Sequence, residues 1–298
     1  MAIGLLLGLG CDPAPASSSA PDVSDTRAVG LAASSLEGIP RLVFFGLHFA
    51  VDPALQADDA ETFLDLAVDD TRQSLVDEFS RFGCETLQIE ADGTALSAVL
   101  RECPVLAWTF DAEVEAVAQL EQADASACAD DFCPTAVAWE LDIAELALGP
   151  RQGRRNRFSG PARLRAPVDP AEPMQWQTSP GYTLETRIGP RFDMLSTARW
   201  RTDDSGCVDM EVGSRLQIEQ TDEPLDGTLG DIVISSRGVR RCPLSCPQAG
   251  EVEVSFRSGS LLRWIYTGED TVQVTGPLGK TLEVTLSCAA MDEEPADE

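Results

Sequence analysis

The residues in this chain whose chemistry is easiest to predict are its nine cysteines. Without Cys11 they form an even set of eight that is spread through strand-like sequence. The set lacks the clustered Cys-x-x-Cys pairs and the histidines that zinc sites use, so we expect no metal. An even number of dispersed cysteines is typical of disulfides formed in an oxidising compartment. Buried reduced thiols in a cytosolic protein are the alternative interpretation.

Turn patterns between the cysteines predict how they pair. Asp92-Gly93 is a strong hairpin pattern between two strand-like segments, and counting outward from it places Cys84 opposite Cys103. The same count about the turn at residues 222–227 gives a second cross-strand pair. Other connectivities remain open to eight cysteines. The predicted disulfides are Cys84–Cys103, Cys207–Cys242, Cys128–Cys133 around a short acidic loop, and Cys246–Cys288.

A short stretch of arginines reverses the acidic charge of the chain. Its members are Arg151, Arg154, Arg155, Arg157, Arg163 and Arg165. Pairing with nearby carboxylates is the simpler interpretation, and docking of an anionic partner such as an acidic glycan or lipopolysaccharide is the alternative. Over the whole chain, 22 basic residues stand against 50 acidic ones, a net charge of −28. This balance repels phosphate groups, so we expect no nucleic acid partner.

Catalytic motifs are hard to find in this sequence. His48, the only histidine, lies in an apolar run and has no serine or cysteine in an elbow pattern to act on. Neither a phosphate loop nor a dinucleotide fingerprint occurs, so no cofactor is expected. Asp203, Asp204 and Asp209, or the stretch 222–231, offer oxygen ligands for calcium, but without the alternating spacing of a calcium loop. We expect solvated turns there.

A glycosidase stays open as an alternative, because it requires only two carboxylates and a groove. Its sugar platforms would be found among the five tryptophans, which otherwise belong to the core. A deep acidic groove lined by tryptophans would favour the enzyme, and buried tryptophans would favour a binding role. The tryptophans are Trp108, Trp139, Trp176, Trp200 and Trp264.

The elements that must position these residues are one helix and a large sheet. Apolar residues at helical spacing and an Asp58 or Asp59 cap predict an amphipathic helix at about 58–82, packed on the sheet. From Cys84 onward the apolar period is two, which indicates half-buried antiparallel strands. We predict a single mainly-β domain, 39–290: a large antiparallel meander sheet, either a sandwich or a partly open barrel, with the one N-terminal helix.

The N-terminal stretch resembles the end of a bacterial lipoprotein signal peptide. Residues 1–11 read MAIGLLLGLGC, an apolar run that ends in a small residue followed by cysteine, as in a lipobox. Residues 12–38 read as a flexible tether and residues 291–298 as an acidic disordered tail. The resemblance implies that Cys11 is lipidated and that the membrane is a partner through this anchor.

A second resemblance covers residues 83–288. A Gly-Cys…Asp-Gly…Cys hairpin is followed by long strands and by a C-terminal pattern matched at Cys246, Gly250, Gly268, Gly279 and Cys288. The arrangement is similar to uncharacterised all-β lipoproteins of myxobacteria and related bacteria, and the resemblance implies the fold and the compartment without an activity.

Together these patterns predict a non-catalytic lipoprotein of the bacterial cell envelope, extracytoplasmic and lipid-anchored at the periplasmic or outer-membrane face. Its role would be structural or binding, with an envelope glycan or another envelope protein as partner. A carbohydrate-active hydrolase that uses paired carboxylates is the first alternative. A carrier of apolar ligands inside a half-open sheet is the second.

Overall fold

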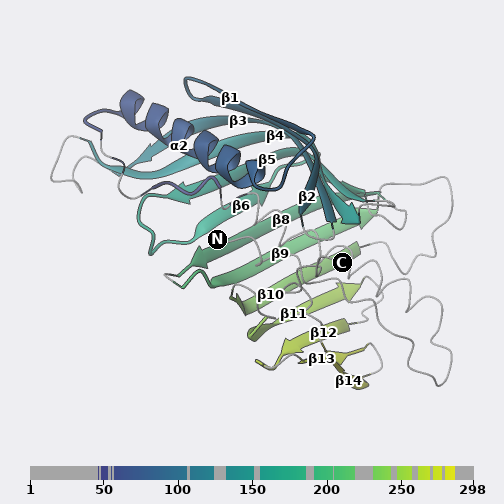
Figure 1. Ribbon diagram of the computed structural model, residues 1–298. Coiled ribbons are helices and arrows are strands. Elements are labelled where there is room, and N and C mark those ends of the chain that lie inside the picture. The colour runs from purple at the N-terminus through teal and green to yellow at the C-terminus, as the bar shows by residue number, and fades with distance from the viewer. Residues whose placement is uncertain are drawn as a thin grey trace, which may run out of the picture. The chain divides into compact units, whose positions relative to one another are not determined.

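The computed structural model describes residues 46, 48–52, 55, 57–105, 108–123, 132–150, 155–185, 191–203, 205–218, 231–242, 247–256, 261–268, 271–276 and 279–285. Within this part of the chain it contains one α-helix, α2 (Ala60–Ser80), and fourteen strands. The strands form an antiparallel meander, which confirms the predicted fold class (Figure 1). Two compact units can be separated, and each is described by itself.

The helix unit comprises Phe45–Gly189 and Asp193–Arg201. Its strands run in the order β1-β2-β3-β4-β5-β6-β8, and the short β7 pairs with β5. The strands are β1 (Thr86–Asp92), β2 (Ala95–Val105), β3 (Trp108–Gln122), β4 (Pro134–Pro150), β5 (Asn156–Pro167), β6 (Met174–Thr178), β7 (Thr183–Glu185) and β8 (Arg191–Thr202).

Helix α2 forms where the spacing of apolar residues predicts it. Asp59 is the N-cap, with its side chain accepting a hydrogen bond from the Thr62 amide, and Glu61 lies in the first turn, where its charge suits the helix dipole. The helix buries a face that includes Phe63, Val68, Leu75 and Phe79, and it packs on β1 to β4. No helix among the described residues is long and apolar enough to span a membrane.

Large aromatic side chains dominate the core of the helix unit. The Phe79 ring stacks on Phe110 of β3 with centroids 5.4 Å apart, and Phe49 meets Trp139 edge to face at 5.1 Å. Aromatic pairs in such geometries add stability beyond the area that they bury. Other fully buried side chains of this unit are Phe63, Phe158, Trp176, Tyr182 and Trp200.

The second unit, here the C-terminal unit, contains the described residues 191–192 and those from 202 onward. Its core is mainly aliphatic and includes Val212, Ile234, Val254 and Leu262. The β-branched valines and isoleucine among them suit a pleated, half-buried surface. Its strands pair in chain order and are β9 (Val208–Ile218), β10 (Asp231–Arg241), β11 (Ala249–Phe256), β12 (Leu261–Tyr266), β13 (Thr271–Thr275) and β14 (Thr281–Thr285).

Candidate functional site

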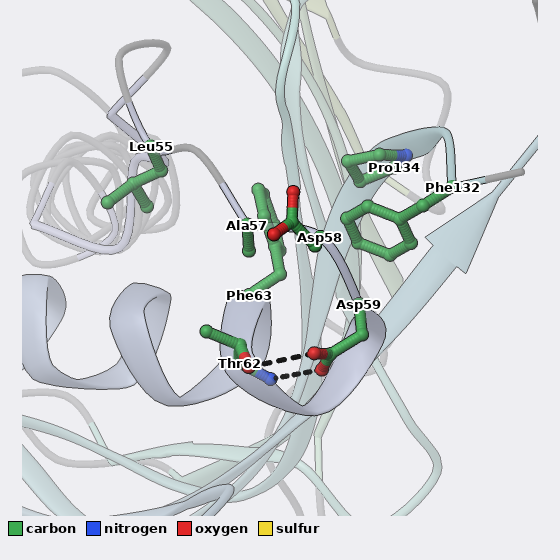
Figure 2. A pocket seen from close by; sticks show the side chains of 8 residues that line it. All are labelled: Leu55, Ala57, Asp58, Asp59, Thr62, Phe63, Phe132 and Pro134. Atoms are coloured by element: carbon green, nitrogen blue, oxygen red, sulfur yellow. Dashed lines mark hydrogen bonds between the residues drawn. The ribbon is translucent and has the colours of Figure 1, made fainter. Parts of the chain in front are cut away.

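A pocket of about 660 Å³ opens at the start of α2 (Figure 2). Its apolar wall includes Phe63 from the helix and Phe132 from the segment before β4, whose rings meet at 5.9 Å. Its polar rim is formed by Asp58, Asp59 and Thr62. The pocket therefore combines an aromatic surface with carboxylate oxygens, which accept hydrogen bonds. The full lining is Leu55, Ala57, Asp58, Asp59, Thr62, Phe63, Phe132 and Pro134.

The helix cap fixes one of the two rim carboxylates. The Thr62 amide donates to Asp59 Oδ1 at 2.9 Å, and the Thr62 hydroxyl donates to Asp59 Oδ2 at 3.0 Å (Figure 2). The backbone hydrogen bond from Thr62 lowers the pKa of the Asp59 carboxyl. Asp59 is consequently ionised at neutral pH, which suits a hydrogen-bond acceptor and does not suit a general acid. Asp58 is exposed at the rim.

The structure contains both cross-strand disulfides predicted from the turns. Cys84–Cys103 joins the base of the β1–β2 hairpin in the helix unit, and Cys207–Cys242 joins the ends of β9 and β10 in the C-terminal unit. These bonds indicate an oxidising, extracytoplasmic environment. Cys133 is also disulfide-bonded. The predictions for Cys11, Cys128, Cys246 and Cys288 lie outside the described residues.

Arg155, a member of the predicted anion-binding cluster, is half-buried between two carboxylates. It forms an ion pair with Asp111 of β3 and another with Glu102 of β2, the latter at 3.0 Å. Glu102 lies at a bulge with a positive φ of 48°, and its amide donates to Asp111 at 2.7 Å. The three side chains thus tie the bulge of β2 to β3 and to the start of β5, which is a structural role.

Three further arginines of the cluster also face carboxylates. All three project from β5, and their partners lie on β3, on β4 and in the loop after β5. A guanidinium already paired with a carboxylate attracts an external anion less strongly. Arg151 and Arg154 lie outside the described residues. The pairs are Arg157 with Glu145, Arg163 with Glu121 and Glu140, and Arg165 with Glu121 and Glu172.

His48 lies against the helix. Its Nδ1 is 3.4 Å from the Ser74 hydroxyl, and its ring centroid is 5.6 Å from that of Phe79. Burial lowers the pKa of His48 to about 4, so the ring is neutral at neutral pH. His48 therefore lies at the boundary between α2 and the segment before it.

Three of the five tryptophans lie in the core. Trp139, Trp176 and Trp200 are 0%, 2% and 1% exposed, so none of the three can stack on a sugar. Trp264 on β12 is partly buried. The side chain of Trp108 lies outside the described residues.

Hydrogen bonds and ion pairs hold the acidic turn before β9 together. Asp203 accepts from the Ser205 hydroxyl and from the Cys207 amide, and Arg240 forms ion pairs with Asp203 and Asp209. The hydrogen bond from Ser205 is the main reason that the pKa of Asp203 falls to about 2. Among the described residues no group of three or more His, Cys, Asp or Glu side chains is arranged to hold a metal ion. Asp204 and residues 222–230 are outside this description.

Sequence reasoning identified Asp58 and Asp59 only as helix caps and missed the pocket that they border. Phe132 was missed altogether, because no local pattern shows that a residue 69 positions after Phe63 meets its ring. Comparison of this chain with protein-family models, with curated proteins and with solved structures gives no match.

Proposed function

We propose that this chain is a non-catalytic protein of the bacterial cell envelope, held at the membrane by a lipid on Cys11, and that its role is to bind a partner. The disulfides of both units support the compartment. The apolar run before Cys11, followed by a polar tether, supports the anchor. The resemblance to uncharacterised myxobacterial lipoproteins agrees with both.

The observation that carries a binding role over a hydrolytic one is the burial of three of the five tryptophans. A sugar-cleaving groove would present such rings to substrate, but Trp139, Trp176 and Trp200 fill the core of the helix unit. The rim carboxylate of Asp59 is held ionised by its cap, whereas a glycosidase needs one carboxyl with a raised pKa.

The pocket at the start of α2 is the proposed binding place. The partly buried ring of Phe132 suits the C–H face of a sugar ring, and the carboxylates of the rim accept hydrogen bonds from hydroxyl groups. The rim is negatively charged, so a neutral or amine-bearing envelope glycan fits better than an acidic one.

The anchor is tested by the mass of the protein purified from a membrane fraction, beside a Cys11→Ser variant. The expected result is an acylated N-terminus at Cys11 in the wild type and a protein released from the membrane in the variant. The same sample, denatured and alkylated without reduction, should carry no label on the other eight cysteines. An unacylated, fully alkylated wild-type chain would overturn the proposal.

The pocket is tested by binding of a neutral oligosaccharide of N-acetylglucosamine. Asp58→Asn should weaken binding at least tenfold, since charge-assisted hydrogen bonds are about twice as strong as neutral ones. Glu90→Gln, which changes an exposed carboxylate on β1, is the matched control and should bind like the wild type. New reducing ends in the incubated glycan would instead favour the hydrolase.

A further inference from the structure

Arg241, the last residue of β10, is a buried cation that no carboxylate neutralises among the residues that the structure describes. Its side chain is 6% exposed, and its Nε is buried with no hydrogen-bond partner. Within the described part of the chain no carboxylate pairs with it, and the phenol of Tyr266 is the one ionisable group that acts on its charge. A buried, unpaired charge is strongly destabilising, so a site of this kind gains stability when an anion enters it.

The neighbouring Arg240 differs from Arg241 because it has carboxylate partners. Arg240 points to the other face of β10 and contacts Asp209 at 2.9 Å, with Asp203 as a second partner. Burial lowers the pKa of Arg241 to about 10, which still leaves its guanidinium protonated at neutral pH. The positive charge of Arg241 is therefore present, and no residue that the structure describes neutralises it.

Gly250 on β11 lies where the backbones of β10 and β11 approach closely, near the end of β10 that carries Arg241. A Cβ there would lie 2.5 Å from Val239 Cα and from the Gly238 carbonyl oxygen, so the backbones of β10 and β11 approach closely at this point. Tyr266 on β12 lies close enough to Arg241 for its phenol to act on the charge of the guanidinium.

Beyond Tyr266 the same face is apolar and becomes progressively more exposed. Val272 is buried, and Trp264, Tyr266 and Val274 pack on it while only partly buried themselves. Trp264 pairs in register with Val274, and Val274 with Leu282 of β14, which is 65% exposed. An apolar row thus runs from the cation toward the exposed Leu282.

We propose that Arg241 and Tyr266 bind the carboxylate of an apolar ligand, a fatty acid, whose hydrocarbon chain lies along Trp264, Val274 and Leu282. A carboxylate carries the single negative charge that neutralises one guanidinium, and Arg binds it through two parallel hydrogen bonds. A dianionic phosphate would leave an excess negative charge in a chain that already carries −28. The hydrocarbon chain would cover apolar surface that is otherwise exposed to water.

The test uses the full chain with Cys11→Ser, exported so that its disulfides form, and dodecanoate below its micelle concentration. Binding is followed by calorimetry and by the fluorescence of Trp264 against a Trp264→Phe variant. Arg241→Met should weaken dodecanoate binding at least tenfold, as expected for the loss of hydrogen bonds to a charged group. The ligand-free Arg241→Met protein should melt at a higher temperature than the wild type, because an unpaired buried charge is gone.

Arg240→Met is the matched control, because it removes the neighbouring charge from the opposite face, and it should bind dodecanoate like the wild type. Dodecanol, which has the same chain and no charge, should bind wild type and Arg241→Met equally weakly. Equal dodecanoate binding by wild type and Arg241→Met would overturn the proposal. Competition by inorganic phosphate would also overturn it, because the site would then select phosphate. Dodecanoate binding at Arg241 does not depend on glycan binding in the pocket at α2. Either proposal can therefore be overturned while the other stands.

Discussion

The two units bury their sheets in different ways. The helix unit covers its strands with α2 and fills the space with large aromatic rings, and the arginines of β5 that the structure describes all face carboxylates. The C-terminal unit uses smaller aliphatic side chains and leaves Leu282 exposed, and within its described residues the buried Arg241 has no carboxylate partner. In the helix unit the arginines have carboxylate partners within the unit. In the C-terminal unit the proposed fatty acid would neutralise the charge of Arg241 and cover the apolar row that leads to Leu282.

The largest expected contrast comes from truncating one buried side chain in each unit. Phe79→Ala should lower the free energy of unfolding by about 3–5 kcal/mol, because it empties the place where the helix meets Phe110. Leu262→Ala should cost about 2 kcal/mol, the lower end for such a change, because β12 lies near the open edge and its neighbours can relax. Urea unfolding followed by circular dichroism measures both. A cost for Leu262→Ala as large as that for Phe79→Ala would show that the C-terminal core is packed as rigidly as the other.

The two disulfides also allow the stability of the two units to be compared, because each bond restricts the unfolded chain of its own unit. Removing Cys84–Cys103, which closes a loop of 19 residues, should cost about 3 kcal/mol in the loop-entropy model. Removing Cys207–Cys242, with a separation of 35 residues, should cost about 4 kcal/mol in the same model. Double Cys→Ser variants of each pair, unfolded in urea, give the two values. A much smaller cost for the second pair would mean that the ends of β9 and β10 are not held together by this bond.

His48 makes the helix unit sensitive to pH. The pKa of His48 is about 4 in the folded protein and about 6.5 in the unfolded chain. Between these two values the unfolded chain binds a proton at His48 and the folded protein does not. The stabilisation is complete above pH 6.5 and is lost as the pH falls toward 4, by about 3 kcal/mol in all. The difference in unfolding free energy between wild type and His48→Asn should follow this curve. Ser74→Ala, which keeps the imidazole, should retain the wild-type pH dependence, and a flat difference curve for His48→Asn would contradict the assignment.

Features set by neighbouring residues were predictable from the sequence. The Asp92-Gly93 turn fixes the register of the first hairpin and with it the Cys84–Cys103 pair, as the pairing of Asp92 with Ala95 confirms. Helix α2 begins one residue after Asp59, one of the two caps proposed for it. In both cases the deciding interaction lies within a few residues along the chain.

Features set by distant contacts were not predictable. Arg241 reads as one more charged residue in a polar stretch, and its burial follows from the register shift between Arg237 and Arg240. The partners of Arg155 lie 44 and 53 residues away on other strands. The alternation of apolar residues tells which positions share a face, but a bulge reverses the assignment beyond it, and a bulge leaves little trace in the sequence.

The smallest expected effects come from two glycines at equivalent irregularities, one in each unit. Gly160 on β5 has a φ of 117°, and a Cβ there would lie 2.6 Å from the Gly181 carbonyl oxygen. Gly250 on β11 has a φ of 104° and faces the backbone of β10 at 2.5 Å. Substitution by alanine should cost each unit about 2 kcal/mol, since L-residues are strained in this region. Gly93→Ala, at a turn with open space around the added methyl, is the control and should cost about 1 kcal/mol.

Dodecanoate binding should distinguish Gly160→Ala from Gly250→Ala more clearly than the free energy of unfolding does. Gly250→Ala pushes apart the ends of β10 and β11 near Arg241, so it should weaken dodecanoate binding. Gly160→Ala strains the helix unit and should leave that binding unchanged. Calorimetry with dodecanoate on both folded variants decides the matter. If both bind like the wild type, the close approach at Gly250 serves only the backbone and does not position Arg241 for a ligand.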